Sequence, residues 1–226
     1  MIKVALITEG VTDQFVIKPI IENYFKDIDF KFNAIQPQID ETDKQDGFGG
    51  WVNVIKWCKS EDLKEVFVFN DFVVIQIDAD VCQEYDVSNM EKGKVLENRE
   101  LCEKIIEKLK SFILPVILEQ YHEKIIFAIG VYSIECWLVP IIDVKHKKQN
   151  VLNCIDKLNK VLNSKKSGFI NPKDKNNSNS RKIYHKLANK FKKKEIIDKL
   201  SKKNDGFECF VEQLNTNLKA SKNFLR

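Results

Sequence analysis

The chain has 226 residues, of which 43% are hydrophobic and 31% are charged, as is typical of a globular protein with a sizeable core. No apolar run approaches the roughly 18 residues needed to cross a bilayer, and the six cysteines are scattered without a Cys-x-x-Cys pair, which argues against a zinc ribbon and a disulfide framework. We therefore expect a cytoplasmic protein with reduced, buried thiols and no membrane partner.

The net charge of +4 is unevenly distributed. Residues 1–144 contain 15 Lys and Arg against 26 Asp and Glu, whereas residues 145–226 contain 22 against 7. This asymmetry suggests acidic active-site residues in the first part and a polyanion-binding surface in the second. The alternative is a lysine-rich helical segment whose charges serve only solubility.

The expected elements alternate between strands and helices. A first strand over 2–8 leads into a helix that starts near Thr12 or Asp13, with Thr12 as its N-cap, Gly10 in the turn and Pro19 as a source of bending. Strands separated by helices predict an α/β fold with a mostly parallel sheet of about four strands. Further strands are expected over 30–39, 72–78 and 124–132, and loops over 40–50, 81–97 and 164–180. A helix is expected to start at 51, and another to cover 98–121 with a possible break at Pro115. Later helices are expected over 150–163, 180–202 and 206–219.

The stretch from Phe72 to Asp80 is the most informative in the chain. Five of its first six residues are apolar, which predicts a fully buried strand, and Asp78 and Asp80 follow at its carboxyl end. Like charges held this close resist joint ionisation unless a cation compensates them. Oxygen ligands favour a hard ion such as Mg²⁺. The alternative is a solvated loop that begins with two acidic residues.

Other carboxylates are expected at the same edge of the sheet. Glu9 and Asp13 follow the first strand, and Glu135 follows the strand over 124–132. Because the carboxyl ends of parallel strands meet at one edge, where α/β sheets place their sites, these groups should converge with Asp78 and Asp80. The sequence therefore predicts a cation site there.

These residues resemble a known family. Glu9-Gly10-x-Thr12-Asp13, Asp78-x-Asp80 and Ser133-x-Glu135, in this order after successive strands, are similar to the Toprim domain of OLD-type nucleases and their small stand-alone relatives. The resemblance covers roughly residues 3–214. Weaker matches are Gly50-Trp51, Ile134-Glu135-Cys136-Trp137-Leu138, Pro172-Lys173, Tyr184-x-Lys186 and Gly206–Phe210.

The resemblance implies a Toprim-like Rossmannoid core over 1–145 and a basic helical extension over 146–226 packed on it. It also implies a Mg²⁺- or Mn²⁺-dependent endonuclease that cuts DNA, or else RNA, in prokaryotic defence against phage or plasmids. Asp13 departs from the family, in which Glu is frequent at this position. Because the chain shows no ATPase module, a separate ATPase subunit is a candidate partner, and self-association is open.

Two cations held by shared carboxylates can activate a water and stabilise the leaving oxygen of a phosphodiester. We assign Asp78 as a bridging ligand, with Glu9 and Asp80 in the first site and Glu135 and Asp13 in the second. The resemblance makes Glu9 a ligand or a general base. Two further residues each have two possible roles. Ser133 would hydrogen-bond a metal-bound water or phosphate, or else its hydroxyl satisfies the backbone at the strand end. Glu84 would support a metal-bound water, or else it is a solvated loop residue.

Phosphoryl transfer also benefits from a cation near the developing charge. The resemblance supplies Lys186 and Lys173, although either could be an ordinary surface lysine. Further basic residues would follow the nucleic-acid backbone by charge alone: Arg181, Lys182, Lys190, Lys192 and Lys193. The alternative function is a non-catalytic nucleic-acid-binding or regulatory subunit that acts with a separate ATPase.

Overall fold

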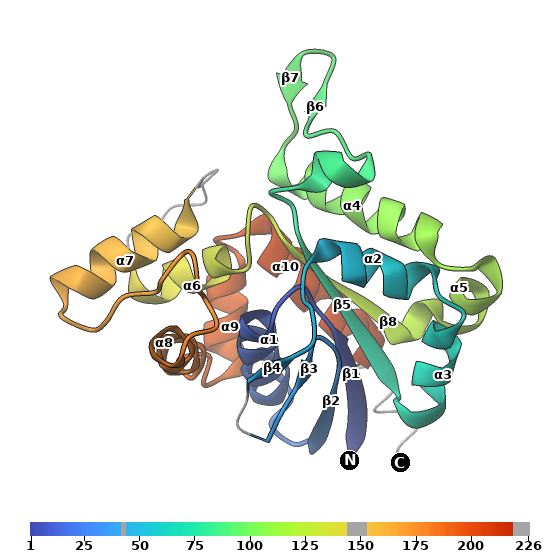
Figure 1. The fold of residues 1–226 in the computed structure, drawn as a ribbon, viewed down its shortest axis with the longest axis horizontal. Coiled ribbons are helices and arrows are strands. Elements are labelled where there is room, and N and C mark those ends of the chain that lie inside the picture. The colour runs from blue at the N-terminus through green and yellow to red at the C-terminus, as the bar shows by residue number, and fades with distance from the viewer. Residues whose placement is uncertain (42–43, 144–152, 219–226) are drawn as a thin grey trace.

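Four parallel strands form the central sheet, in the order β2-β1-β5-β8 (Figure 1). The structure, a computed structural model, describes residues 1–41, 44–143 and 153–218. Every residue of β5 and β8 is buried, as expected of parallel strands covered on both faces. The four strands are β1 (Ile2–Ile7), β2 (Phe30–Gln36), β5 (Phe72–Asp78) and β8 (Ile125–Gly130).

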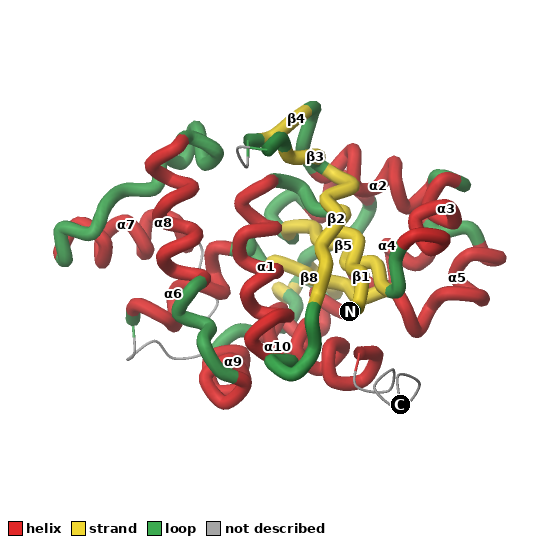
Figure 2. Tube along the Cα trace, turned by 90° about the horizontal axis from the view of Figure 1, so that it is seen from below, coloured by secondary structure: helices red, strands yellow, loops and turns green. Residues whose placement is uncertain are grey.

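Helices cover both faces of this sheet (Figure 2). Alternate strand residues point to opposite faces, so Val4 and Leu6 join the cluster under α1 and α6–α10, and Ala5 and Ile7 join the cluster under α2–α5. None of the described helices is long and apolar enough to cross a membrane. The helices are α1 (Val11–Tyr24), α2 (Trp51–Lys59), α3 (Asp62–Phe69), α4 (Asn98–Phe112), α5 (Pro115–Tyr121), α6 (Glu135–Ile142), α7 (Cys154–Ser164), α8 (Ser178–Ala188), α9 (Lys194–Ser201) and α10 (Asp205–Gln213).

The expected loops contain short regular elements. The segment after β2 forms an antiparallel pair, and the segment over 81–97 contains a 3-10 turn and a second antiparallel hairpin, which projects from the body at the top of Figure 1. The short elements are β3 (Gln38–Ile39), β4 (Gln45–Asp46), η1 (Cys82–Tyr85), β6 (Met90–Glu91), β7 (Lys94–Val95), η2 (His122–Lys124) and the π-turn η3 (Leu214–Leu218).

Two helix predictions need correction, and a third is confirmed. Helix α1 is capped by Gly10 and not by Thr12, because the Asp13 carboxylate accepts a hydrogen bond from the Gly10 N–H at 2.7 Å. The segment over 98–121 has the break that Pro115 predicts: it forms two helices, and Pro115 starts the second, where its missing N–H costs no hydrogen bond. The segment over 180–202 also divides, into α8 and α9.

The prediction that the cysteines are reduced is wrong for two of them. Cys136 and Cys154 form a disulfide, with Cα atoms 5.1 Å apart, that joins α6 to α7. Sequence spacing alone does not reveal such a pairing, because the partners meet only through the packing of their helices. The other cysteines are free and buried: Cys58, Cys82, Cys102 and Cys209.

The predicted boundary between 1–145 and 146–226 falls among residues outside the described part. On either side of it the chain contributes to one hydrophobic cluster. Trp137 of α6 stacks on Phe207 and Phe210 of α10, with ring centroids 4.9 and 5.2 Å apart. The helices after residue 153 therefore pack directly against the sheet domain.

The sheet order places a crevice between β1 and β5. From β1 the chain crosses to β2 on one side, and the following strands β5 and β8 lie on the other side. Helices that leave neighbouring strands in opposite directions open a crevice beyond their carboxyl ends, where α/β proteins bind ligands. The residues after β1 and β5 lie at that crevice.

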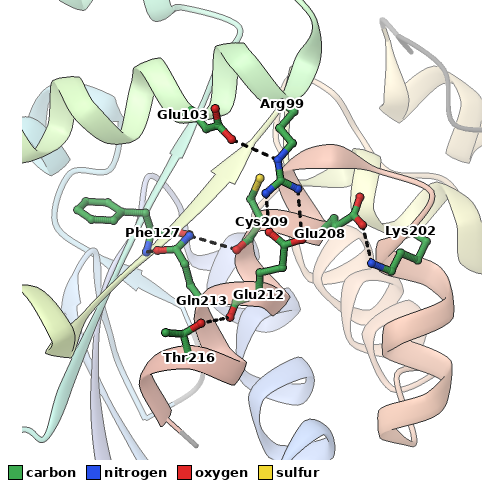
Figure 3. Close-up of polar contacts among 9 residues, drawn as sticks. All are labelled: Arg99, Glu103, Phe127, Lys202, Glu208, Cys209, Glu212, Gln213 and Thr216. Carbon is green, nitrogen blue, oxygen red and sulfur yellow. Dashed lines mark hydrogen bonds and ion pairs between the residues drawn. The ribbon is translucent and has the colours of Figure 1, made fainter. Parts of the chain in front are cut away.

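The outer edge of β8 is covered by α10 through an amide side chain (Figure 3). The Phe127 N–H donates to Gln213 Oε1 at 2.9 Å, and Gln213 Nε2 donates to the Phe127 carbonyl at 2.9 Å. Arg99 of α4 donates to both carboxylate oxygens of Glu212, at 3.2 and 2.7 Å, which ties α10 to the helix layer. Gln213 thus takes the place of a neighbouring strand and protects the edge from pairing with other chains.

We predict that Gln213→Ala lowers the free energy of unfolding by about 1–2 kcal/mol, because two backbone groups of Phe127 lose their partner. Gln213→Glu should also destabilise, since a carboxylate accepts from the Phe127 N–H but cannot donate to its carbonyl. Urea unfolding measures both variants. Gln83→Ala, at an exposed glutamine, is the control and should change stability by less than about 0.5 kcal/mol; equal effects at both positions would contradict the edge-pairing role.

Candidate functional site

The structure brings the five predicted carboxylates together at the crevice. Glu9 follows β1, Asp13 lies in the first turn of α1, Asp78 ends β5, Asp80 follows it, and Glu135 begins α6. Their charges act on one another: the pKa of Asp78 is raised first by its own burial and then by Glu9, Asp13 and Glu135. The convergence predicted from the strand ends is therefore present.

Glu9 and Asp78 are joined by a hydrogen-bonded ring that includes Gln76. Glu9 Oε1 accepts from the Asp78 N–H at 2.6 Å, and the Glu9 N–H donates to Gln76 Oε1 at 2.9 Å. Gln76 Nε2 in turn donates to Asp78 Oδ1 at 2.9 Å. Gln76 was not predicted as a site residue, although a polar residue inside an otherwise apolar strand is a signal in the sequence.

Asp78 also positions the start of α6. Its Oδ1 accepts from the Ile134 N–H at 3.0 Å, one residue before Glu135. This contact requires glycine at the end of β8, because a Cβ on Gly130 would lie 2.2 Å from Asp78 Oδ1 and 2.7 Å from the Ile134 nitrogen. Gly130 therefore allows the Asp78 carboxylate to reach the backbone of the next site element.

Glu135 is fully buried and is held by two residues from the carboxyl-terminal half. Its Oε1 lies 2.8 Å from Lys175 Nζ and accepts from the Tyr184 hydroxyl at 2.5 Å. Its second oxygen, Oε2, is buried and has no hydrogen-bond partner among the described residues. Lys175 is 36% exposed, so the pair reaches from the interior to the solvent side of the crevice.

The remaining predicted residues differ in exposure. Asp13 is buried and is held by Gly10, whereas Asp80 is exposed. Ser133 is half-buried, and its hydroxyl helps to lower the pKa of Glu135. Glu84 lies exposed in η1. Asp80 and Glu84 are therefore both accessible to solvent.

Burial raises the pKa of most of these carboxyls. It raises the pKa of Glu9 to about 8, aided by the charges of Asp13 and Asp80. It raises the pKa of Asp13 to about 7, aided by Glu135. The pKa of Asp80 is also raised, mainly by desolvation. The ionised forms of Glu9 and Asp13 have too little positive charge nearby, so near neutral pH these two carboxyls retain protons unless a cation replaces them.

Glu135 behaves in the opposite way. Burial alone would raise its pKa, but the charge of Lys175 and hydrogen bonds from Lys175, Tyr184 and Ser133 outweigh burial and lower it. Desolvation would lower the pKa of Lys175, but Glu135 and Asp78 raise it. Glu135 and Lys175 are therefore an ionised pair.

The lysine at the carboxylates is not one of the two that were predicted. Lys173 and Lys186 are exposed, and Lys175 reaches Glu135 instead. No signal distinguished it, because this polar segment lacks hydrophobic periodicity. Among the basic residues predicted to bind nucleic acid, Arg181 is half-buried, and the exposed ones are Lys182, Lys190, Lys192 and Lys193.

The donor chemistry of the site fits a hard cation. All five side chains offer oxygen, and Glu135 Oε2 is a buried acceptor without a donor. As placed, one oxygen each of Glu9, Asp78 and Glu135 is turned onto a protein donor. Within the described ranges, no three Asp, Glu, His or Cys side chains are grouped so that they could hold a metal ion. A cation would therefore need these side chains to turn toward a common point.

Comparison of the chain with protein-family models, with curated proteins and with solved structures finds no match. The Toprim resemblance therefore stays a prediction that depends on the residues quoted for it. The function proposed for the chain therefore depends on the geometry of the five carboxylates.

We predict that Glu9 makes stability fall with rising pH in the absence of divalent metal. Its carboxyl binds a proton more tightly in the folded chain, so its contribution is fully present below its ordinary pKa of 4.5 and is lost as the pH rises to about 8. Glu9→Gln keeps an acceptor for the Asp78 N–H but removes the titration. Urea unfolding in EDTA should show that the stability of this variant relative to wild type rises with pH across that range. The limiting slope is about 1.4 kcal/mol for each pH unit.

The control for this measurement is Glu84→Gln, because Glu84 is an exposed carboxylate. Its stability relative to wild type should stay constant over the same pH range. A constant difference between Glu9→Gln and wild type would show that Glu9 ionises without cost to the fold.

Proposed function

We propose that the chain is a metal-dependent nuclease that hydrolyses phosphodiester bonds of DNA with Mg²⁺ or Mn²⁺. The observation that supports this most is the meeting of five carboxyl groups, from the ends of β1 and β5 and from α1 and α6, beside Lys175. So many acidic groups held together, several of them buried, are unfavourable for the fold and are more often found where a site binds a cation. A Toprim-like version of the Rossmann-like fold, acting in prokaryotic defence, is part of the same proposal.

Glu9, Asp13, Asp78, Asp80 and Glu135 would hold the metal. When bound, two ions would activate a water and stabilise the leaving oxygen of the phosphodiester. Their charge would also replace the protons that the raised pKa values of Glu9 and Asp13 favour. Metal binding should therefore release protons near neutral pH.

The protein side chains have separable tasks. Gln76 and the Ile134 N–H orient Asp78, and the Asp78 N–H holds Glu9 Oε1. Glu9 Oε2 is then the oxygen that binds a cation or accepts a proton from the attacking water. Lys175 Nζ, at the solvent side of the carboxylates, would stabilise negative charge that develops on the phosphoryl oxygens.

The exposed lysines after residue 180 would supply most of the affinity for the DNA backbone. Lys182, Lys186, Lys190, Lys192 and Lys193 are all exposed, and α8, which contains the first two, also contains Tyr184 of the site. Backbone contacts of this kind give binding that falls steeply with salt and that ignores sequence.

A second candidate is a nucleic-acid-binding or regulatory subunit without catalysis, acting with a separate ATPase. The ammonium of Lys175 at the carboxylates favours it, because this cation already balances Glu135. Calorimetric titration with Mn²⁺ separates the two: the nuclease binds the metal, whereas the subunit binds DNA in a salt-dependent way without metal uptake.

The nuclease proposal predicts that wild type converts supercoiled plasmid into nicked or linear forms in Mg²⁺ or Mn²⁺. Asp78→Asn and Asp80→Asn should each slow this by roughly 100-fold or more, because a metal ligand is lost. Asp80→Asn is the more decisive variant, since Asp80 is exposed and its replacement should leave the fold unchanged. Plasmid cleavage by Asp80→Asn and wild type at the same rate would refute the proposal.

We predict that Lys175, and not Lys173, supports cleavage. Lys175→Met should slow plasmid cleavage by roughly 100-fold, as expected when a charge that stabilises the transition state is removed. Lys173→Met, at the exposed lysine two residues earlier, is the matched control and should change the rate by less than about twofold. Lys175→Arg keeps the ion pair with Glu135. Its urea-unfolding midpoint, compared with that of Lys175→Met, distinguishes loss of structure from loss of catalytic charge.

A further inference from the structure

Phe48 has an exposed aromatic side chain that belongs to neither hydrophobic cluster of the described residues. It exposes 88% of its surface, more than any other large hydrophobic side chain of the described residues. An aromatic ring is normally buried, because it contributes a large apolar area to a core or interface. A single exposed ring needs no explanation by itself, so its setting in the structure has to be considered.

The loop that presents Phe48 is held by side-chain amides. Gln36 Nε2 donates to the Phe48 carbonyl at 2.8 Å, and Asn53 Nδ2 donates to the Gly49 carbonyl at 2.8 Å. Gln36 ends β2 and Asn53 lies in the first turn of α2. Two regular elements therefore fix the loop on either side, and the ring is displayed from an ordered backbone.

The same loop is bonded to the backbone of Glu9. The Gly50 N–H donates to the Glu9 carbonyl at 2.7 Å. A Cβ on Gly49 would lie 2.4 Å from that carbonyl oxygen, so only glycine allows the approach. Phe48 thus lies two residues before a direct hydrogen bond to the backbone of Glu9, one of the five predicted acidic residues.

The hairpin β6–β7 supplies a second, independent set of exposed apolar side chains at this end of the sheet. Met90 and Val95 face each other across the two strands and are 48% and 63% exposed. Lys92 in the turn and Lys94 beside Val95 are also exposed, and the one acidic residue of the hairpin, Glu91, forms an ion pair with Lys104. Figure 1 shows that the hairpin projects from the end of the molecule to which the segment after β5 leads. Apolar groups next to lysines suit a ligand with both charged and aromatic parts, as nucleic acid has.

We propose that Phe48 stacks on an unpaired nucleobase next to the scissile phosphate, so that the site acts on single-stranded or locally unpaired DNA. This inference rests on the proposed nuclease function and names its substrate class. In an intact duplex the base faces are covered by neighbouring bases, so only a splayed base can offer its face to an aromatic ring. Stacking of this kind tolerates any sequence, because every base has such a face.

Binding of three labelled DNA ligands of equal length tests the proposal. They are a single strand of mixed sequence, the duplex formed by that strand and its complement, and an abasic strand that has the phosphates but no bases. Fluorescence anisotropy in EDTA prevents cleavage. We expect wild type to bind the single strand more tightly than the abasic strand, and Phe48→Ala to lose roughly tenfold in affinity for the single strand only. Phe48→Trp should retain the affinity, because it keeps an aromatic face.

Phe69→Ala is the matched control, because the Phe69 side chain is also exposed, at 67%. Phe69 ends α3, just before the start of β5, and so lies at the opposite end of the sheet from the carboxylates. The Phe69→Ala variant should bind all three ligands like wild type. The proposal is overturned if Phe48→Ala weakens the binding of all three ligands equally. It is also overturned if the variant weakens the binding of none of them, as expected if Phe48 contacts a protein partner instead. Base-dependent binding without metal-dependent cleavage would instead reject the nuclease function and leave the stacking role standing.

Discussion

The ion pair between Glu135 and Lys175 is the interaction on which the arrangement of the site depends. Glu135 is fully buried at the start of α6, and an uncompensated charge there would be strongly destabilising. Its partners, Lys175 and Tyr184, both come from the basic part of the chain. The same contacts that neutralise the carboxylate therefore also fix the loop before α8, and α8 itself, against the sheet domain.

Among the described residues, the other four carboxylates form no ion pair comparable to that of Glu135, and this difference explains the electrostatics of the crevice. One ammonium group lowers the pKa of Glu135, whereas the pKa values of Glu9, Asp13, Asp78 and Asp80 are all raised. Protons can satisfy these groups in the absence of another cation. A site that stores protons in this way exchanges them for a divalent ion with little loss of local charge balance.

The sequence predicted the parts of the site that follow from strand ends. The apolar run before Asp78, and the strands before Glu9 and Glu135, placed these carboxylates at one sheet edge, and the parallel sheet confirms that placement. Lys175 could not be predicted, because its position depends on how the polar loop folds back onto α6. The Gly10 cap and the disulfide of Cys136 and Cys154 likewise depend on contacts that spacing does not encode.

Lys175 has to be reconciled with a cation at the same carboxylates. It contacts Oε1 of Glu135, while the buried Oε2 of the same group lacks a donor. The two oxygens can thus serve different positive charges, one from the protein and one from solution. Lys175 is partly exposed, so in the proposed nuclease its ammonium would turn toward a phosphate once a divalent ion compensates Glu135. Under the proposed function, this one side chain would stabilise the buried carboxylate and also contact the substrate.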